Sequence, residues 1–348
     1  MIQTRFLSLP HGITLSCRIA GEEGRPVLMF LHGFPEAAFV WDGLLAHFAR
    51  PENGGYFCIA PNLRGFEQSS APADPAAYRA KHLVQDIAAL IAAVCVDQHE
   101  ESLPASRGRG TGFAGPQAQR PSSSCKGQRT AEGTRSDKRG GHLEALVAHD
   151  WGGAVAWSVA ALMPQLMNKL VIINSPHPAT FLRELQNSPS QQAASAYMNF
   201  LIRPDAEALL AEDDFRRLWQ FLTNGSGPQA GGAPAWLTDE VRDQYRAVWR
   251  AGLTGGCNLY RASPLRPPRP SDPAAAAVTL PPATLTVLLP TLVLWAMDDI
   301  ALPPALIDGL ADYVPHMQLE RVPGASHWIV HEQPDLVARL IADFLGQP

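Results

Sequence analysis

The chain has 348 residues, of which 46% are hydrophobic and 18% charged, and its formal net charge is −5 at pH 7. These values suit one large α/β domain with an accessory segment, and the negative charge argues against a nucleic-acid partner. The five cysteines, at positions 17, 58, 95, 125 and 257, have no paired spacing, which argues against a disulfide framework and a zinc site. The first residues do not form the apolar core of a signal peptide, and prolines interrupt the most apolar stretch, 278–297. We therefore expect no membrane segment and a cytoplasmic location.

The first part of the chain predicts strands and helices in alternation. Residues 5–9 and 13–20 are typical of two strands joined by a turn. The continuous apolar run 26–31 is typical of a central strand covered on both faces. The elements expected next are a helix near 41–50, a strand at 56–60 and a helix over 78–96, whose apolar residues have helical spacing.

Residues 98–141 interrupt this alternation. They have almost no apolar periodicity and are rich in glycine, serine, proline, arginine and glutamine. Such a segment cannot bury enough apolar surface to offset the entropy lost on ordering, so we expect a disordered surface insertion. A basic docking arm is the functional alternative, because basic residues outnumber acidic ones in this segment.

Residues 143–153 are typical of a nucleophile elbow, the sharp turn between a strand and a helix that exposes a catalytic side chain. Asp150 stands at the centre of the turn, with the small residues Ala148 and Gly152 two positions before and after it. An aspartate in this place would attack saturated carbon and form an ester with the enzyme. The alternative is an ordinary turn in which Asp150 caps the following helix.

After the elbow, a strand at 169–174 precedes a segment of different character. Residues 179–285 are helical and polar with proline and glycine breaks, which inside an α/β chain indicates a cap or lid. We therefore expect a core made of residues 1–178 and 286–348 and a cap of residues 179–285. The elements expected in the second core part are a strand at 291–295, a helix at 305–314, a strand at 317–322 and a final helix from Pro334.

Three titratable side chains follow expected strands, namely Asp150, Asp299 and His327. Sites assemble beyond the carboxyl ends of strands in open α/β sheets, so these side chains are expected to meet. A single loop aspartate is most often a turn residue, and a single histidine is most often structural. Their joint placement after successive strands favours a catalytic set, with Asp298 as the alternative for the acid.

The motifs around these residues resemble those of the α/β-hydrolase superfamily, most of all its epoxide hydrolase branch. The resemblance covers nearly all of the core and parts of the cap. Two motifs are His32-Gly33-Phe34-Pro35, similar to the family's oxyanion motif with a typically cis proline, and His149-Asp150-Trp151-Gly152-Gly153, similar to its nucleophile motif. The other two are Trp295 to Asp299, similar to the acid motif with Ala296 in place of glycine, and Gly324 to His327, similar to the histidine motif.

The resemblance implies an α/β-hydrolase fold, in which a mostly parallel central sheet is flanked by helices and a helical cap is inserted after the sixth strand. It implies that Asp150 is the nucleophile and that His327, oriented by Asp299, activates water. Tyr197 and Tyr260 would hold the epoxide oxygen from the cap, whereas the alternative for each is a packed cap residue. The other implied site residues are Phe34 and Trp151, whose backbone N–H groups would form the oxyanion hole, and the supporting residues His32, Gly33, Pro35, His149 and Gly152.

The resemblance also implies the partners of the chain. The substrate would be a small apolar epoxide or a related electrophile, and the reaction would need no metal or cofactor. We expect neither a nucleic-acid nor a membrane partner, and either a monomer or a homodimer.

Two positions depart from the family's loop Asp-x-Arg-Gly-x-Gly-x-Ser, where Asn62 replaces the aspartate and Glu67 the second glycine. The insertion at 98–141 is also unusual for the family. A haloalkane or haloacetate dehalogenase would use the same Asp–His–Asp set but needs halide-binding donors, for which Trp151 is a candidate. Asp150 disfavours a serine esterase, and a non-catalytic small-ligand-binding protein on the same scaffold is the alternative outside enzymes.

Overall fold

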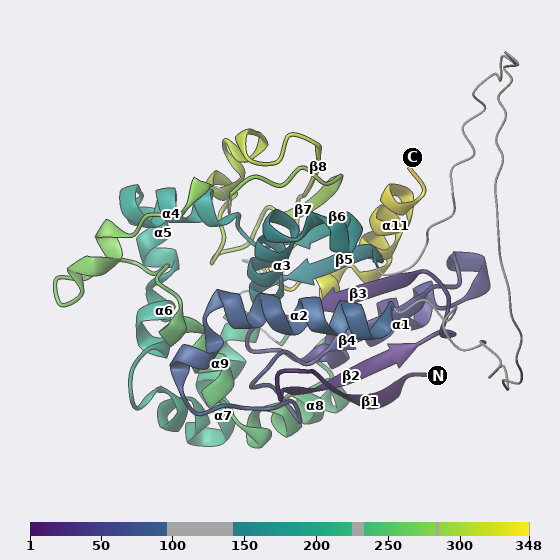
Figure 1. Ribbon diagram of the computed structural model, residues 1–348. Helices are drawn as coiled ribbons and strands as arrows, with labels where there is room; N and C mark the ends of the chain where they lie inside the picture. The colour runs from purple at the N-terminus through teal and green to yellow at the C-terminus, as the bar shows by residue number, and fades with distance from the viewer. Residues whose placement is uncertain (96–141, 225–232, 283–284, 348) are drawn as a thin grey trace, which may run out of the picture.

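The computed structural model describes residues 1–95, 142–224, 233–282 and 285–347 (Figure 1). The segment 98–141, for which the sequence predicts a disordered surface insertion, lies outside the described residues. Both of its interpretations therefore stay predictions.

Within the described residues, eight strands form one sheet in the order β1-β2-β4-β3-β5-β6-β7-β8. β2 pairs antiparallel with β1 and β4, and the other neighbouring strands pair parallel. The expected mostly parallel central sheet is therefore confirmed. The strands are β1 Gln3–Ser8, β2 Thr14–Ala20, β3 Val27–Leu31, β4 Phe57–Pro61, β5 Leu143–His149, β6 Met167–Ile173, β7 Thr291–Ala296 and β8 Met317–Val322.

The side chains of the inner strands alternate between two apolar layers. In β3, which is buried along its whole length, Met29 and Leu31 join the layer that contains α2 and α3. Leu28 and Phe30 join the layer that contains α1 and α11. Successive side chains of a strand point to opposite faces, so a strand covered by helices on both faces requires a continuous apolar run. These helices are α1 Asp42–Phe48, α2 Ala80–Val94, α3 Asp150–Leu162 and α11 Pro334–Leu345.

Helices occupy the chain between β6 and β7, which confirms the expected insertion after the sixth strand. We call residues 178–277 the helical insertion. Figure 1 shows its helices gathered on one side of the molecule, at the left of and below the sheet. The dihedral angles of residues 212–215 leave the helical region, so α7 consists of two segments. The elements are α4 Pro178–Asn187, α5 Pro189–Ala194, α6 Ala196–Leu201, α7 Ala206–Asn224, α8 Asp239–Ala251, α9 Thr254–Ala262 and the 3₁₀ helix η5 Pro273–Ala277.

The prediction of one helix at 305–314 is wrong. The apolar residues of this range are buried at helical spacing, but Asp308 is extended and Gly309 has a φ of 71°. A left-handed residue interrupts a helix, so this stretch forms two short 3₁₀ helices instead, η7 Pro304–Ile307 and η8 Leu310–Asp312. The helix expected over 78–96 begins later, at Ala80, because Arg79 is extended. The remaining short helices are η1 Ala38–Trp41, η2 Pro51–Asn53, η3 Pro75–Tyr78, η4 Pro164–Leu166 and α10 Ile329–Glu332.

Across the described ranges, no helix combines the length and the apolar character that crossing a bilayer requires.

Candidate active site

Asp150 lies at the predicted sharp turn between a strand and a helix. β5 ends at His149 and α3 begins at Asp150, whose φ of 49° lies in the left-handed region. The turn is crowded, because a Cβ at Gly152 would lie 2.3 Å from the carbonyl oxygen of Leu31 in β3. Only glycine allows this close approach of α3 to β3. The turn therefore holds the Asp150 side chain beyond the carboxyl ends of the central strands.

The loop after β3 brings the backbone of Phe34 to Asp150. The Phe34 N–H donates a hydrogen bond of 2.7 Å to Oδ1 of Asp150. A Cβ at Gly33 would lie 2.2 Å from the same oxygen, so glycine is required for this contact. The peptide bond between Phe34 and Pro35 is cis, as the resemblance implied.

His32 holds this loop as a neutral side chain. Its Nδ1 donates to the carbonyl oxygen of Gly33 at 2.9 Å, and its Nε2 accepts from the N–H of Leu63 at 3.1 Å. Burial lowers the pKa of His32 from 6.5 to about 4, so the ring carries no charge at neutral pH. The role of His32 in the structure is to position the backbone of residues 33 and 34.

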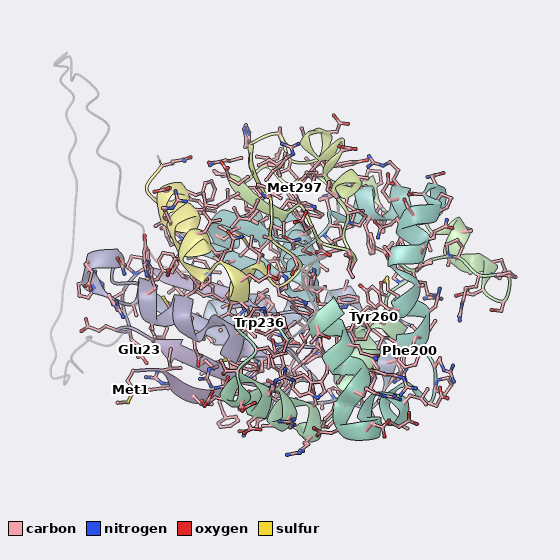
Figure 2. All side chains as sticks on the ribbon, turned by 180° about the vertical axis from the view of Figure 1, so that it is seen from behind. Met1, Glu23, Phe200, Trp236, Tyr260 and Met297 are labelled. Carbon is pink, nitrogen blue, oxygen red and sulfur yellow. The ribbon has the colours of Figure 1, made fainter. Side chains whose placement is uncertain are left out.

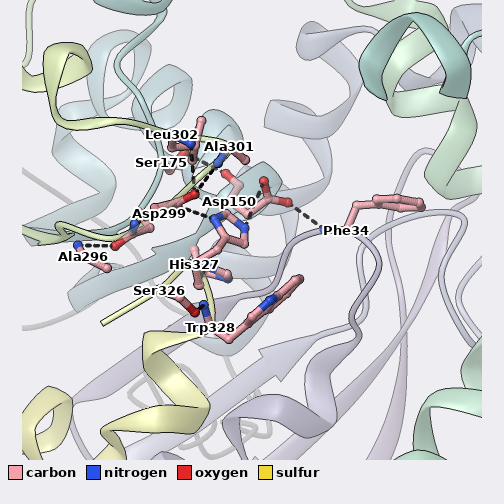
Figure 3. A network of polar contacts seen from close by, with 12 residues as sticks. Phe34, Asp150, Ser175, Ala296, Asp299, Ala301, Leu302, Ser326, His327 and Trp328 are labelled. Carbon is pink, nitrogen blue, oxygen red and sulfur yellow. Dashed lines mark hydrogen bonds and ion pairs between the residues drawn. The ribbon is translucent and has the colours of Figure 1, made fainter. Parts of the chain in front are cut away.

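His327 lies between two carboxylates, with Phe34 on the far side of Asp150 (Figure 3). Its Nδ1 is 2.6 Å from Oδ2 of Asp299, and its Nε2 is 3.8 Å from Oδ2 of Asp150. Because an ionised carboxylate can only accept, Nδ1 donates to Asp299, and Nε2 is turned toward Asp150. The structure thus brings together the three side chains that the sequence analysis placed after successive strands.

The carboxylate of Asp299 is fixed by further donors. Nδ2 of Asn174 donates to Oδ2 at 2.9 Å, and the N–H groups of Ala301 and Leu302 donate to Oδ1 at 2.8 and 2.9 Å. Asp298, the alternative for the acid, is exposed, and Asp299 is buried. The geometry therefore selects Asp299 as the partner of His327.

The buried charges stabilise one another. Burial lowers the pKa of His327, but the negative charges of Asp299, Asp150 and Glu36 outweigh it and raise this pKa from 6.5 to about 9. Burial raises the pKa of Asp299, but the charge of His327 and the hydrogen bonds from His327 and Asn174 outweigh it and lower this pKa below 3.8. At neutral pH, His327 and Asp299 therefore form an ion pair.

Tyr197 on α6 and Tyr260 on α9 reach the site from the helical insertion. Their ring centroids are 6.0 Å apart, and Tyr260 packs edge to face on Trp151, with 5.0 Å between ring centroids. Burial, and after it nearby negative charge that includes Asp150, raises the pKa of both phenols. Both side chains are therefore neutral hydrogen-bond donors at neutral pH. In Figure 2, Tyr260 lies on the side of the molecule that carries the insertion, away from Met1.

Two glycines explain how α9 places Tyr260. A Cβ at Gly255 would lie 2.1 Å from the carbonyl oxygen of Gly65, and a Cβ at Gly256 would lie 2.7 Å from the ring of Phe34. The first turn of α9 is thus in direct contact with two loops of the core. Tyr260, one turn further along α9, is consequently held over Phe34, with 5.4 Å between ring centroids.

A cavity of about 550 Å³ lies beside these groups, and Asp150, Asp299, His327, Tyr197 and Tyr260 all line it. Its volume is in the range of pockets that hold whole small-molecule ligands, roughly 300–1,000 Å³. Among the residues that the structure describes, no group of three or more His, Cys, Asp and Glu side chains is placed to hold a metal ion. Much of the remaining lining is apolar, including Phe200, Phe221, Ile300 and Trp328.

Two polar residues at the end of β6, Asn174 and Ser175, belong to the site and were not predicted from the sequence. Asn174, with a φ of 39°, donates to Asp299 and accepts from the N–H of Ala296 at 2.7 Å. The hydroxyl of Ser175 donates to the carbonyl oxygen of Asp150 at 2.7 Å. Both residues directly follow β6, which lies between β5 and β7 in the sheet. Their position at the carboxyl edge of the sheet is the sequence feature from which their part in the site could have been predicted.

A buried network of polar side chains around Glu36 was also not predicted from the sequence. Oε1 of Glu36 accepts from the hydroxyl of Tyr245 on α8 at 2.7 Å and lies 2.7 Å from Nε2 of His331. Oε2 of Glu36 is 3.4 Å from Nδ1 of His149, whose Nε2 is 3.0 Å from the backbone oxygen of His327. The network connects the helical insertion, the loop after β3 and the loop that carries His327.

The two departures from the family's loop lie against each other. The side-chain amide of Asn62 donates to the carboxylate of Glu67, and Glu67 has a φ of 49° at the position where the family has glycine. Asn62 is fully buried, and its Oδ1 also accepts from the N–H of Ala38 at 2.7 Å. Asn62 thus provides a side-chain oxygen that accepts a hydrogen bond from the segment after β3, as an aspartate could. The carboxylate that an aspartate would bring to this loop is instead provided by Glu67.

Comparison with known proteins gives a consistent family assignment. The profile of the alpha/beta hydrolase family matches residues 28–340. The AB hydrolase superfamily protein YfhM of Bacillus subtilis is 30% identical over 96% of this chain and 95% of its own length. Epoxide hydrolase 4 of Mus musculus is 28% identical over 94% of this chain and 75% of its own length.

Solved structures agree with this assignment. One of the novel epoxide hydrolases found in metagenomes from hot environments superposes with a TM-score of 0.76 at 31% identity, over 100% of both chains. The epoxide hydrolase of Bacillus megaterium, at 24% identity and over 99% of this chain and 100% of its own, superposes with a TM-score of 0.75 and shows the same fold. With a family profile over most of its length and a relative 30% identical over nearly all of it, this chain belongs to the alpha/beta hydrolase family.

Proposed function

We propose that the protein hydrolyses epoxides to vicinal diols through a covalent ester on Asp150. The observation that carries the proposal is that the carboxylate of Asp150 and two neutral phenols meet at a largely apolar cavity. The similarity to proteins named epoxide hydrolases supports it. The proposed substrate is a small apolar epoxide, and residues 179–285 are proposed to cover it as a cap.

In the first step, the carboxylate of Asp150 attacks an epoxide carbon, the carbon–oxygen bond breaks, and negative charge moves to the ring oxygen. Tyr197 and Tyr260 hydrogen-bond to this oxygen, and one of them transfers its proton to it. The charge of Asp150 contributes to the raised pKa of both phenols in the free enzyme. This charge disappears as the ester forms, so the phenols become more acidic when the proton is needed.

In the second step, His327 takes a proton from water, and the resulting hydroxide attacks the ester carbonyl carbon. Asp299 keeps Nε2 of His327 turned toward Asp150 and stabilises the imidazolium. The N–H groups of Phe34 and Trp151 would hold the oxyanion, each contributing about 3 kcal/mol. The proton on His327 passes to the leaving diol oxygen. The proton that remains on the Asp150 carboxyl returns to the tyrosinate, so the Asp150 carboxylate and both phenols are regenerated.

The tyrosines distinguish this reaction from halide displacement. A departing halide leaves with its electron pair and needs no proton, whereas the epoxide oxygen stays attached to the substrate. The indole of Trp151, the candidate halide donor, packs edge to face against the ring of Tyr260, with 5.0 Å between ring centroids. The pair of phenols at the cavity favours the epoxide over the dehalogenase alternative.

Replacing Tyr260 or Tyr197 with phenylalanine is expected to slow alkylation of Asp150 by about 10- to 1,000-fold. This is less than the full contribution of a general acid, about 10²–10⁴-fold, because the other phenol remains. Decay of the ester should change little, and single-turnover rapid-quench kinetics separates the two steps. Tyr313→Phe is the matched control, since Tyr313 stacks on His177 and does not line the cavity. Wild-type alkylation in both variants would make the tyrosines packing residues.

Hydrolysis of the ester is expected to accelerate as pH rises, because His327 must be neutral to accept a proton. The pKa of about 9 in the free enzyme includes the effect of the Asp150 charge, which the ester removes. The rate of ester decay should be measured between about pH 6 and 9. The pH at which this rate reaches half of its maximum should lie below the pKa of about 9 that His327 has in the free enzyme. A decay rate that does not rise with pH would contradict His327 as the base.

The direct test of the proposal is a hydrolysis screen of epoxides, haloalkanes and haloacetates with the purified protein. We expect diol from epoxides and no halide release. Halide release without diol would favour the dehalogenase, and saturable epoxide binding without product would favour the non-catalytic binding protein. The cytoplasmic location also stays a proposal, and it is supported by the free buried thiols of Cys17, Cys58, Cys95 and Cys257.

A further inference from the structure

Two cavities of very different size meet at the proposed reaction centre. The larger, of about 550 Å³, extends toward Phe200, Phe221 and Ile300. The smaller, of about 80 Å³, extends toward Phe181, Met198 and Leu302. Of the described residues, three line both cavities, and these are Asp150, Tyr197 and Tyr260.

The shared residues locate the epoxide ring. The nucleophile must touch a ring carbon, and the phenols must touch the ring oxygen, so the ring lies where the two cavities adjoin. Each cavity then offers space for the substituent of one of the two ring carbons. His327 and Asp299 line the larger cavity, so the water that hydrolyses the ester approaches from that side.

We propose that the substrates are epoxides with two unequal sides. One ring carbon carries a group the size of an aromatic ring or larger, and the other carries hydrogen or a group of up to about three carbons. An apolar cavity of about 150 Å³ can hold a benzene molecule, and the smaller cavity, of about 80 Å³, has about half of that volume. This inference rests on the proposed function, because it assumes that Asp150 attacks an epoxide at the junction.

The walls of the smaller cavity resist expansion. Met198, Leu302 and Tyr260 are 3–4% exposed and belong to the main apolar core. Pro176 and Pro178 restrict the backbone on another side. Close-packed interiors deform only at a cost in free energy, so a phenyl group on this side would have to displace packed core atoms.

Two residues in the walls of the smaller cavity also form hydrogen bonds with the proposed catalytic residues. The backbone N–H of Leu302 donates to Asp299, and the hydroxyl of Ser175 donates to the backbone of Asp150. A substituent that pushed these walls outward would therefore displace the acid and the nucleophile as well. A large second substituent should consequently lower kcat in addition to raising KM.

The test compares three epoxides that share one phenyl group and differ in the second substituent. These are styrene oxide, trans-β-methylstyrene oxide and trans-stilbene oxide, which carry hydrogen, methyl and phenyl. We expect kcat/KM for the first two to agree within about 10-fold and kcat/KM for the third to be lower by about 100-fold or more. Comparable values for all three would overturn the inference and leave the proposed function intact. Hydrolysis of none of them would overturn the proposed function and the inference together.

Enlarging the smaller cavity should relax this preference. Met198→Ala is expected to raise kcat/KM for trans-stilbene oxide relative to styrene oxide by about 10-fold or more. Phe181→Ala is the second variant, because Phe181 is only partly buried and its truncation removes less core packing. Ile202→Ala is the matched control, since Ile202 directly follows α6 and lines neither cavity, and its substrate ratio should stay at the wild-type value. Folded Met198→Ala and Phe181→Ala proteins that both keep the wild-type ratio would overturn the assignment of this wall.

Discussion

Replacing Asp150 with alanine should abolish epoxide turnover in a protein that stays folded. The variant loses the nucleophile, while the ion pair of His327 with Asp299 and the cavity walls remain. We expect turnover to fall by about 10⁶-fold, the scale seen when a covalent hydrolase loses its nucleophile. Diol formation measures the loss. Alanine at a φ of 49° costs about 1–2 kcal/mol, so circular dichroism should show a melting temperature only a few degrees lower.

Asp298→Ala is the matched control for this variant. Asp298 is also an aspartate at the carboxyl edge of the sheet, but its side chain is exposed and turnover should not change. Near-wild-type turnover in a folded Asp150→Ala protein would remove Asp150 as the nucleophile.

Replacing His327 with glutamine should stop the reaction at the covalent intermediate. Alkylation requires Asp150 and the tyrosines, whereas hydrolysis of the ester also requires a base at the position of His327. Ring opening is an addition, so intact-protein mass spectrometry should show one adduct per chain with the mass of the whole epoxide. Peptide mapping should place the adduct on Asp150.

The mass of the adduct also distinguishes an epoxide hydrolase from a dehalogenase. A haloalkane would add its own mass less that of hydrogen halide, because the halide leaves in the first step. The double variant Asp150→Ala/His327→Gln is the control and should stay unmodified. An unmodified His327→Gln protein with confirmed substrate binding would contradict the two-step scheme.

The sequence predicted those parts of the fold that depend on short-range patterns. The strand at 317–322 has the expected bounds, and the apolar run 26–31 is the buried strand β3. The same reasoning failed at 305–314, because buried side chains kept a helical spacing while Gly309 turned the backbone out of the helix. Periodicity reports which residues are buried, and it does not detect one left-handed residue.

The parts that the sequence did not predict depend on contacts between distant segments. Asp298 and Asp299 are neighbours in one loop, and what distinguishes them is the contact of Asp299 with Asn174 and His327. Glu36 and Tyr245 are far apart in the chain, yet they share a hydrogen bond in the buried network. The volumes of the two cavities likewise result from packing among four or more elements, which no local pattern encodes.

The contact between Asn62 and Glu67 makes the residue tolerated at one of these positions depend on the residue at the other. An aspartate at position 62 beside Glu67 would bring two carboxylates together next to the core, where like charges repel strongly. Asn62 beside a glycine at position 67 would keep a neutral amide and a backbone that tolerates a positive φ. The energetic cost of an aspartate at position 62 therefore depends on whether glutamate or glycine occupies position 67, so neither position can be evaluated without the other.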